Sequence, residues 1–361
     1  MIRSGVVPLG TDIPTRHSGI LDWAICLGTS DVDQSNIGNC LDLVKELGAS
    51  YVRMDFSWGL LMPHEGQIDD AKVDQYDNVV RVCEEKGVAI VAVVGAGGTW
   101  PDWAKNKYNF KRFQGDYQRI RDDWIGLCRF VAQNWGGSIR YFQVLNEENH
   151  VYHQKIRVDE QCPAIKDAHD AISSASPGSE IIVNVHTSVP SWESWKSRLA
   201  RWLRDAGEAI DVVAIDHYPG TYTFFTGPGD WAALDQLMEI CKANRKKGAI
   251  METGFSSWAK NDLPWYCPIA RTHDEKGQVN FINQALPIIL NKVREHNRTT
   301  EYKIAMASWF TLTGDGQRAW TSLQALHLGK YVEPNFGAVK DHANRKLCFD
   351  ALKEQISAFY D

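Results

Sequence analysis

Short runs of apolar residues alternate with longer amphipathic segments along most of the chain. Several runs are almost continuously apolar, such as residues 88–94 and 212–215. This pattern is typical of strands that are buried on both faces of a parallel sheet covered by helices. The eight predicted strands span residues 21–27, 50–56, 88–94, 139–145, 180–185, 211–216, 248–252 and 303–309.

The segments between these runs carry apolar residues at helical spacing. Within residues 116–135, for example, Ile120, Trp124, Leu127 and Val131 fall on one helical face. Such spacing indicates core packing and needs no functional explanation. The predicted helices span residues 37–47, 116–135, 164–176, 194–206, 231–246, 279–295 and 341–358.

Eight strand–helix alternations predict an α/β protein with the (β/α)8 architecture of a TIM barrel. We expect a single catalytic domain over residues 1–361, with residues 1–20 as an N-terminal extension. Enzymes with this barrel place their sites at the carboxyl ends of the strands. Functional residues are therefore expected at the carboxyl ends of the predicted strands.

Charge and hydropathy exclude several classes of partner. The net charge is -6, and no block of lysine or arginine suggests nucleic-acid binding or a membrane-surface site. No apolar run reaches about 18 residues, so we expect no transmembrane helix. The N-terminal residues lack a signal-peptide pattern, which predicts a cytoplasmic protein or a secreted one whose signal was removed. The oligomeric state is left open.

The eight cysteines show no C-x-x-C spacing that would indicate a metal or redox motif. Four of them are expected to be free core thiols, namely Cys26, Cys83, Cys128 and Cys241. A disulfide elsewhere, involving Cys162 or Cys267, is the alternative.

Two glutamates follow predicted buried strands. Glu147 comes after the run 139–145, and Glu252 comes after the run 248–251. Two carboxyl groups delivered by two strand ends of one barrel meet the requirement for hydrolysis of a glycosidic bond. Because Glu148 directly follows Glu147, only one of these neighbours is expected to point inward.

Polar residues at other strand ends are candidates for supporting this pair. Arg53 lies inside a predicted strand, where a charged group needs a partner, either a catalytic glutamate or another strand residue such as Asp55. Asn146 precedes Glu147 and has the chemistry to bind a sugar 2-hydroxyl. His186 ends the next strand and is as much a structural as a functional candidate.

Further candidates lie at the ends of the later strands and in the loops. His217 and Tyr218 precede Glu252 by one strand, and either side chain suits a partner that holds a carboxylate ionised. Trp309 ends the last strand as a sugar platform or as a barrel plug. Trp100 and Trp258 belong to a set of 14 tryptophans, and we expect sugar stacking or rim packing for them.

In this order, these strand ends resemble those of the clan A retaining glycoside hydrolases, most closely families 5 and 39. The resemblance rests on Arg53, Asn146-Glu147, His217-Tyr218, Glu252 and Trp309, and it spans almost the whole chain. It implies Glu147 as general acid/base, Glu252 as nucleophile and Asn146 as a contact to the 2-hydroxyl. Arg53 and Tyr218 would orient the nucleophile, and Trp309 would stack under the sugar. The second glutamate at position 148 departs from the Asn-Glu-Pro of many relatives.

The implied reaction needs a carbohydrate substrate and neither a metal nor an organic cofactor. Three alternatives are left open. The first is a metal-dependent sugar isomerase or lyase that uses Asp216, His217 and both glutamates as ligands. The second is an inactive carbohydrate-binding barrel, and the third is transglycosylation. Sugar identity, linkage and endo or exo action are not predicted.

Overall fold

The computed structural model describes ten ranges of the chain, and the following sections concern these residues only. The expected extension 1–20, Trp258 and Cys267 lie outside them. The described residues are 21–28, 31–32, 35–95, 100–108, 116–150, 154–187, 193–221, 226–257, 274–314 and 335–360.

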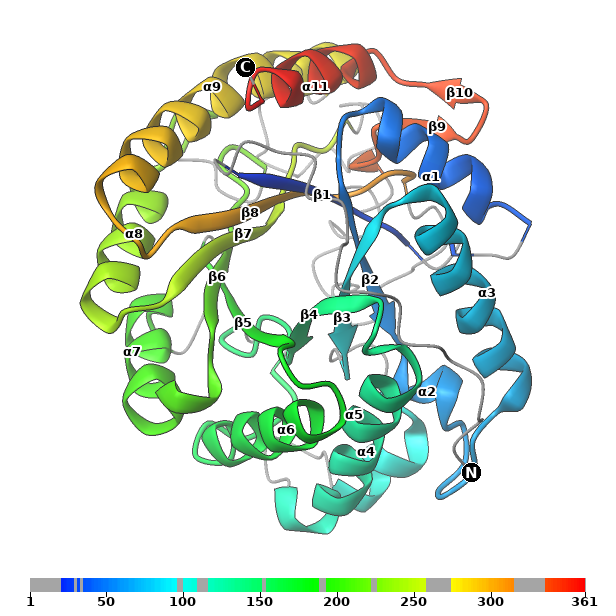
Figure 1. Ribbon diagram of the computed structural model, residues 1–361. Helices are drawn as coiled ribbons and strands as arrows, with labels where there is room; N and C mark the ends of the chain where they lie inside the picture. The colour runs from blue at the N-terminus through cyan, green and yellow to red at the C-terminus, as the bar shows by residue number, and fades with distance from the viewer. Residues whose placement is uncertain are drawn as a thin grey trace, which may run out of the picture. The chain divides into compact units, whose positions relative to one another are not determined.

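Eight strands form one closed barrel, with each strand next to its neighbours in chain order and with helices around it (Figure 1). The fold is therefore the predicted (β/α)8 TIM barrel, and each predicted strand overlaps an observed one. The strands are β1 (Asp22–Cys26), β2 (Tyr51–Phe56), β3 (Ala89–Val94), β4 (Ile139–Val144), β5 (Glu180–His186), β6 (Val212–Asp216), β7 (Lys247–Thr253) and β8 (Ile304–Trp309).

The helices bury the apolar faces that their spacing predicts. In α5, for instance, Trp124, Leu127, Cys128 and Val131 are all buried. The longer helices are α1 (Ile37–Glu46), α3 (Asp70–Lys86), α5 (Arg121–Trp135), α6 (Gln161–Ala175), α7 (Trp195–Ala206), α8 (Ala232–Asn244), α9 (Glu275–Thr299) and α11 (Cys348–Ser357). The shorter elements are α2 (Trp58–Leu61), α4 (Asp102–Tyr108), and the 3-10 turns η3 (Tyr117–Arg119) and η4 (Gly207–Ala209).

Two helical segments differ from the prediction. Helix α3 is absent from the predicted set, although its buried residues do follow helical spacing. The predicted helix 341–358 is wrong at its start, where β9 (Val339–Asp341) and β10 (Asn344–Arg345) form a small antiparallel hairpin. The carboxylate of Asp341 accepts hydrogen bonds from the backbone of Ala343 and Asn344, which favours a turn over a helix.

Contacts along the chain group into two compact units. Residues 53–186 and 190–214 belong to one unit, in which α5 and α6 pack together outside β3, β4 and β5. Residues 16–52, 187–189 and 215–361 belong to the other, in which α9 packs against α11, and β8 pairs with both β7 and β1. Each unit thus contributes its own set of strand ends.

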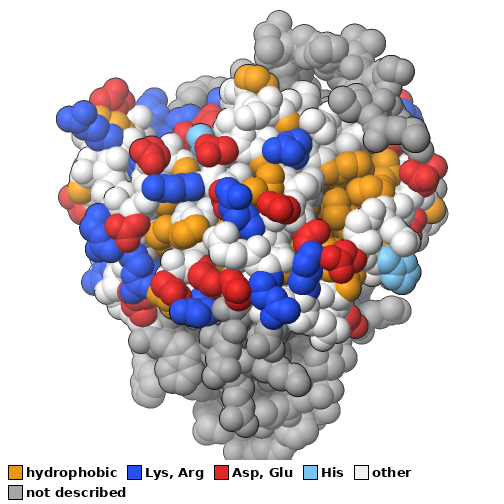
Figure 2. All heavy atoms as spheres, turned by 90° about the horizontal axis from the view of Figure 1, so that it is seen from below, with side chains coloured by type: hydrophobic (Ala, Val, Ile, Leu, Met, Phe, Trp, Pro, Cys, Tyr) orange, Lys and Arg blue, Asp and Glu red, His pale blue; other side chains and the backbone are white. Residues whose placement is uncertain are grey.

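The surface in Figure 2 carries acidic and basic side chains side by side, without a continuous basic area on that face. Within the described ranges, no helix is both long and apolar enough to cross a membrane. The seven described cysteines are buried and free, which confirms the expected core thiols and leaves Cys162 without a disulfide.

Candidate active site

The chain leaves β4 through a turn with unusual backbone angles. Leu145 has a φ of 64° and Glu147 has a φ of 51°. Both angles lie in the left-handed region, which residues other than glycine rarely adopt. Such angles persist only where the surroundings impose them, and they are common at functional sites. Here the backbone N–H of Glu147 donates to the side-chain oxygen of Asn184 on β5, at 3.2 Å.

The side chain of Asn146 sits between these two strained residues, and its orientation is fixed by three donors. Its Oδ1 accepts from Arg53 Nη2 at 2.9 Å, from Gln143 Nε2 at 2.8 Å and from Asn184 Nδ2 at 3.0 Å. Because an arginine can only donate, the oxygen of Asn146 must be the atom that faces this network. Its Nδ2 is then the group left to donate to a bound molecule.

Arg53 belongs to the same network and is buried. Its Nε donates to the side-chain oxygen of Gln143 at 2.8 Å, in addition to the bond to Asn146. These bonds satisfy a guanidinium that would otherwise be costly inside a barrel. Arg53 therefore aligns the amides that precede Glu147.

Glu147 lies beside the end of β5. Its side chain is only 4% exposed, and its Oε1 lies 3.8 Å from Nε2 of His186 at the end of β5. The backbone of His186 is in turn held by Asn149, whose amide donates to the His186 carbonyl and accepts from the His186 N–H. The predicted candidate His186 thus lies beside the Glu147 carboxylate.

Glu148 has a different environment, under the loop that follows β4. Its carboxylate accepts the backbone N–H groups of Lys155 and Ile156 at 2.8 and 3.1 Å. Burial raises the pKa of Glu148 to about 7, and these hydrogen bonds with the nearby charges of Lys155 and Arg198 limit the rise. Glu148 therefore holds the backbone of residues 155 and 156 in place.

Glu252 lies within β7 and is held through its carboxylate. The hydroxyl of Tyr218 donates to Glu252 Oε2 at 2.6 Å, which fixes the orientation of the carboxyl group. The carbonyl of Glu252 also accepts the backbone N–H of His217 at 2.9 Å, which ties the end of β6 to β7. A carboxylate oxygen of Asp216, fully buried, lies within 4.8 Å of one from Glu252.

Both nitrogens of the His217 imidazole lie within hydrogen-bond distance of other groups of the protein. Its Nε2 lies 2.7 Å from the carbonyl oxygen of Asp230 and its Nδ1 lies 2.6 Å from the hydroxyl of Thr187. A carbonyl only accepts, so Nε2 carries the proton, and burial lowers the pKa of the ring. His217 thus anchors the loop before α8 with its side chain, while its neighbour Tyr218 contacts Glu252.

The ring of Trp309 lies in the core of the protein. It is 0% exposed and packs against Phe281 of α9. The next residue, Phe310, is partly exposed and lies edge-to-face with Tyr218 and Phe336. A side chain at Gly254 would come within 2.6 Å of the Phe310 carbonyl, so this glycine permits the close approach of the chain after β8.

Trp100 is also buried. Its ring lies edge-to-face with Trp58 and Tyr108, and its Nε1 donates to the carbonyl of Gly95. With 3% of its surface exposed, it has no face available for a sugar, so its place in this structure is rim packing.

Two residues of the site were missed in the sequence, namely Gln143 on β4 and Asn184 on β5. Each is a buried amide between apolar neighbours in its strand. That composition was the available signal, because a buried amide must have hydrogen-bond partners. Here Gln143 bonds Arg53 and Asn146, and Asn184 bonds Asn146 and the backbone of Glu147.

The sequence of the chain matches one protein-family model. The family model for cellulase (glycosyl hydrolase family 5) matches residues 26–221, which is more than half of the chain. No curated protein sequence matches the chain.

Solved structures share the fold at low sequence identity. A family 39 glycoside hydrolase from the gut symbiont Bacteroides cellulosilyticus WH2 is 15% identical with a TM-score of 0.65, covering 94% of this chain and 64% of that one. The exo-β-1,4-mannosidase Op5Man5 from Opitutaceae bacterium strain TAV5 is 15% identical with a TM-score of 0.67, covering 94% and 60%. The family 1 β-glucosidase from Thermotoga maritima is 12% identical with a TM-score of 0.66, covering 94% and 97%.

The chain therefore spans less than two thirds of the first two of these structures. At 12–15% identity, these three solved structures show that the fold is shared, whereas the family model matches the amino-acid sequence. On that match, the chain belongs to glycosyl hydrolase family 5.

Proposed function

We propose that the chain is a retaining glycoside hydrolase that cleaves a β-type glycosidic bond of a glycoside, oligosaccharide or polysaccharide. The observation that carries this proposal is a buried glutamate at the carboxyl end of β4 and another at that of β7, in one closed barrel. Glu147 is fixed by Asn184, and Glu252 by Tyr218. Retention requires the two carboxyl groups to flank one bond, about 5–5.5 Å apart.

In the first step, the carboxylate of Glu252 attacks the anomeric carbon. The bond from that carbon to the glycosidic oxygen breaks, and the oxygen takes the proton of Glu147 as it leaves. The result is a glycosyl ester on Glu252. The hydrogen bond from Tyr218 supports this role because it fixes the orientation of the carboxylate.

In the second step, Glu147 accepts a proton from water while the water oxygen attacks the anomeric carbon. The ester bond to Glu252 breaks, its carboxylate is restored, and the sugar leaves with its original anomeric configuration. A sugar hydroxyl in place of water would give transglycosylation by the same route. Neither step requires a cofactor.

Neighbouring side chains support the substrate contacts that we propose. The amide Nδ2 of Asn146 donates to the sugar 2-hydroxyl, because its oxygen is already fixed by Arg53 and the two amides. Phe310, rather than Trp309, supplies the aromatic platform, because its ring is partly exposed beside Tyr218. His186 lies next to Glu147 and assists the transfer of its proton.

A metal-dependent sugar isomerase or lyase is the second candidate. It is favoured by the carboxylate oxygens of Asp216 and Glu252, which lie close enough to share a cation. The Tyr218 hydroxyl distinguishes the two candidates, because it already occupies Oε2 of Glu252 as a hydrogen-bond donor. Hydrolysis that persists in EDTA, below the unfolding temperature, would exclude the metal-dependent reaction.

The test is a substrate panel assayed with the wild type and with Glu147→Gln, Glu252→Gln and Glu148→Gln. Aryl β-glucosides and β-mannosides come first, because β-glucosidases and an exo-β-1,4-mannosidase share the fold, and β-linked oligosaccharides follow. We expect hydrolysis with retention, seen by NMR of the first product anomer, and its loss in the Glu147 and Glu252 variants only. Inversion would refute the mechanism, and binding without turnover would indicate a non-catalytic barrel.

A further inference from the structure

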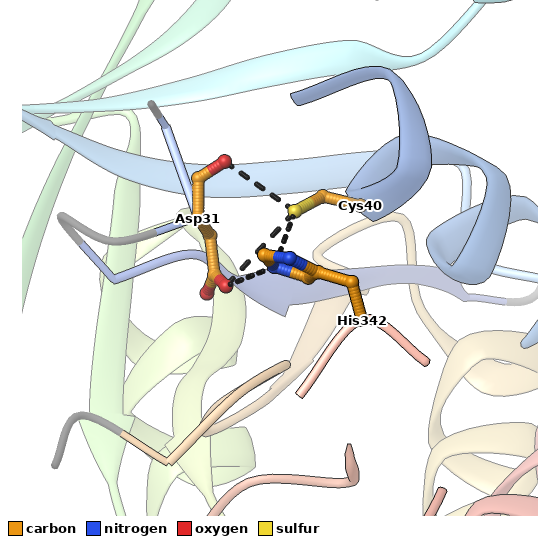
Figure 3. Close-up of side chains that lie close together, drawn as sticks. All are labelled: Asp31, Cys40 and His342. Atoms are coloured by element: carbon orange, nitrogen blue, oxygen red, sulfur yellow. Dashed lines mark hydrogen bonds and ion pairs between the residues drawn. The ribbon is translucent and has the colours of Figure 1, made fainter. Parts of the chain in front are cut away.

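Asp31, Cys40 and His342 converge on one point, and Figure 3 shows their side chains facing one another. Asp31 follows β1, Cys40 lies in α1, and His342 lies at the turn between β9 and β10. All three belong to the same compact unit, and they form a group of potential ligands different from the one that contains Glu252. Sequence spacing gave no signal for this group, because its members are up to 311 positions apart.

The three potential ligand atoms form a small triangle. Cys40 Sγ lies 3.1 Å from His342 Nε2, His342 Nε2 lies 3.2 Å from Asp31 Oδ1, and Cys40 Sγ lies 4.0 Å from Asp31 Oδ1. A tetrahedral zinc ion with bond lengths of about 2.3 Å to sulfur and about 2.0 Å to nitrogen and oxygen separates its ligands by roughly 3.3–3.5 Å. The observed triangle matches this size within about half an ångström on each side.

The arrangement does not suit a nucleophilic triad. A Cys–His–Asp relay uses opposite ring nitrogens, one for the thiol and the other for the carboxylate. Here the same nitrogen, Nε2 of His342, faces both groups. This nitrogen offers a single proton or a single lone pair, whereas one cation at the centre satisfies all three groups together.

Burial strengthens the case for a cation. Asp31 and Cys40 are both 0% exposed, and an ionised carboxylate in such a place needs compensation. Within the described part of the chain, no lysine or arginine pairs with Asp31, and His342 is its ion-pair partner. The His342 side chain is 20% exposed, which gives an ion a path from solvent and room for a water as fourth ligand.

The carboxylate of Asp31 is also oriented by hydrogen-bond donors outside the triangle, as ligands of bound metals usually are. The hydroxyl of Thr313, in the chain after β8, donates to Asp31 Oδ1 at 2.5 Å. The backbone N–H of Gly28 donates to Asp31 Oδ2 at 3.0 Å. These two donors fix the carboxylate in the orientation that faces Cys40 and His342.

We propose that Asp31, Cys40 and His342 bind one divalent transition-metal ion, with zinc as the favoured metal from the mixture of sulfur, nitrogen and oxygen donors. The ion links the loop after β1, helix α1 and the β9–β10 hairpin, and through Thr313 it reaches the chain after β8. Because β1 and β8 pair directly, the ion stabilises the first and last strands of the barrel where they meet. Its role is structural and independent of the proposed hydrolysis.

Metal binding must displace the thiol proton. Burial, and next the charge of Asp31, hold the pKa of Cys40 well above its ordinary value. In the metal-free protein Cys40 is therefore a thiol, and the cation converts it to a thiolate ligand.

The test uses full-length protein stripped with EDTA, desalted and titrated with Zn²⁺ or Co²⁺. We expect one equivalent to bind, a sulfur-to-cobalt charge-transfer band in the near ultraviolet, and an unfolding temperature that zinc raises by a few degrees. His342→Asn, at a partly exposed turn, should abolish the band and the shift. Thr313→Val should retain both and weaken binding by about 10–100-fold.

Cys241→Ser is the matched control, because Cys241 is another fully buried thiol of the same unit. It should bind zinc as the wild type does, whereas Cys40→Ser should not, with circular dichroism verifying that each variant is folded. The proposal is overturned if the stripped wild type gives no charge-transfer band. It is equally overturned if His342→Asn binds cobalt with the wild-type spectrum.

Discussion

The regions around Glu147 and Glu252 hold a buried glutamate in different ways. Glu147 is held through its backbone, in a left-handed turn whose N–H is bonded by Asn184 and whose neighbour Asn146 is fixed by three donors. Glu252 is held through its carboxylate, by the hydroxyl of Tyr218, on a regular strand. In the first region, the contacts fix the position of the Glu147 backbone. In the second, they fix the orientation of the Glu252 carboxylate.

This difference matches the demands of the two roles that we propose. A nucleophile must keep one oxygen aimed at the anomeric carbon, which a short bond to its second oxygen achieves. An acid/base must gain and lose a proton in every cycle, so its position is better fixed through the backbone than through a strong donor on the carboxylate. The comparison therefore predicts distinct consequences of mutation in each region.

The largest expected effect separates the two glutamates by leaving group. Glu252→Gln should lower kcat by more than about 10³-fold for every substrate, because no covalent intermediate forms. Glu147→Gln should lower kcat/KM, which reports the first step, by about 10²–10⁴-fold for poor leaving groups but far less for a dinitrophenyl glycoside, whose departure needs no proton. Steady-state kinetics across a series of aryl glycosides measures this.

Glu148→Gln is the control for both, because it places the same change beside Glu147 under the loop of Lys155 and Ile156. Its kinetics should match the wild type. A Glu148 variant as inactive as the Glu147 variant would reverse our assignment of the acid/base.

The next effect concerns two neighbours at the end of β6. Tyr218→Phe removes one bond to a charged group, worth about 1.5–3 kcal/mol, so kcat should fall by about 10–150-fold for good and poor leaving groups alike. His217→Gln should leave kcat within a few-fold and lower the free energy of unfolding by about 1–3 kcal/mol, because it loses the anchor to Asp230. Kinetics and urea unfolding of both variants test this, and a rate loss confined to His217→Gln would reverse their roles.

A smaller kinetic effect is expected on the Glu147 side. Asn184→Ala removes the acceptor of the Glu147 N–H and one donor to Asn146, so kcat/KM should fall by about tenfold. The loss should be greater for poor leaving groups, as with Glu147 variants. A loss that is uniform across leaving groups would indicate that Asn184 acts on the nucleophile instead.

The last effect is on stability alone. Glu148 loses its proton near pH 7 in the folded chain and near its ordinary 4.5 in the unfolded chain, so between these values the folded state binds more protons. Its stability should therefore fall as pH rises from about 4.5 to 7, by up to about 3 kcal/mol relative to Glu148→Gln, and level off above pH 7. Urea unfolding at a series of pH values measures this, and parallel curves for both proteins would contradict it.

The sequence was sufficient for the barrel because several strands are almost continuously apolar, as buried parallel strands are, and the predicted strand boundaries agree within about two residues. The sequence did not predict the hairpin around residues 341–344. There the Asp341 carboxylate stabilises a turn, although the pattern of apolar residues is helical. Local hydrogen bonding of this kind is decided by geometry that periodicity does not contain.

For the site, chain order was enough to place Glu147, Tyr218 and Glu252 at strand ends. It could not assign the aromatic residue at the end of β8, because a shift of one residue moves a side chain to the other face of a strand. Trp309 packs outward on Phe281, and Phe310 occupies the position beside Tyr218. The group of Asp31, Cys40 and His342 was likewise hidden, since only the fold brings these residues together.

The most direct test of the central claim is the stereochemistry of azide rescue with the best substrate of the panel. Azide should restore turnover of an activated aryl β-glycoside in both alanine variants. Glu147→Ala should give the β-glycosyl azide, because azide attacks the glycosyl ester, and Glu252→Ala should give the α-glycosyl azide, because azide replaces the nucleophile. The opposite pair of products, or full activity without azide in both variants, would contradict the assignment of these two glutamates.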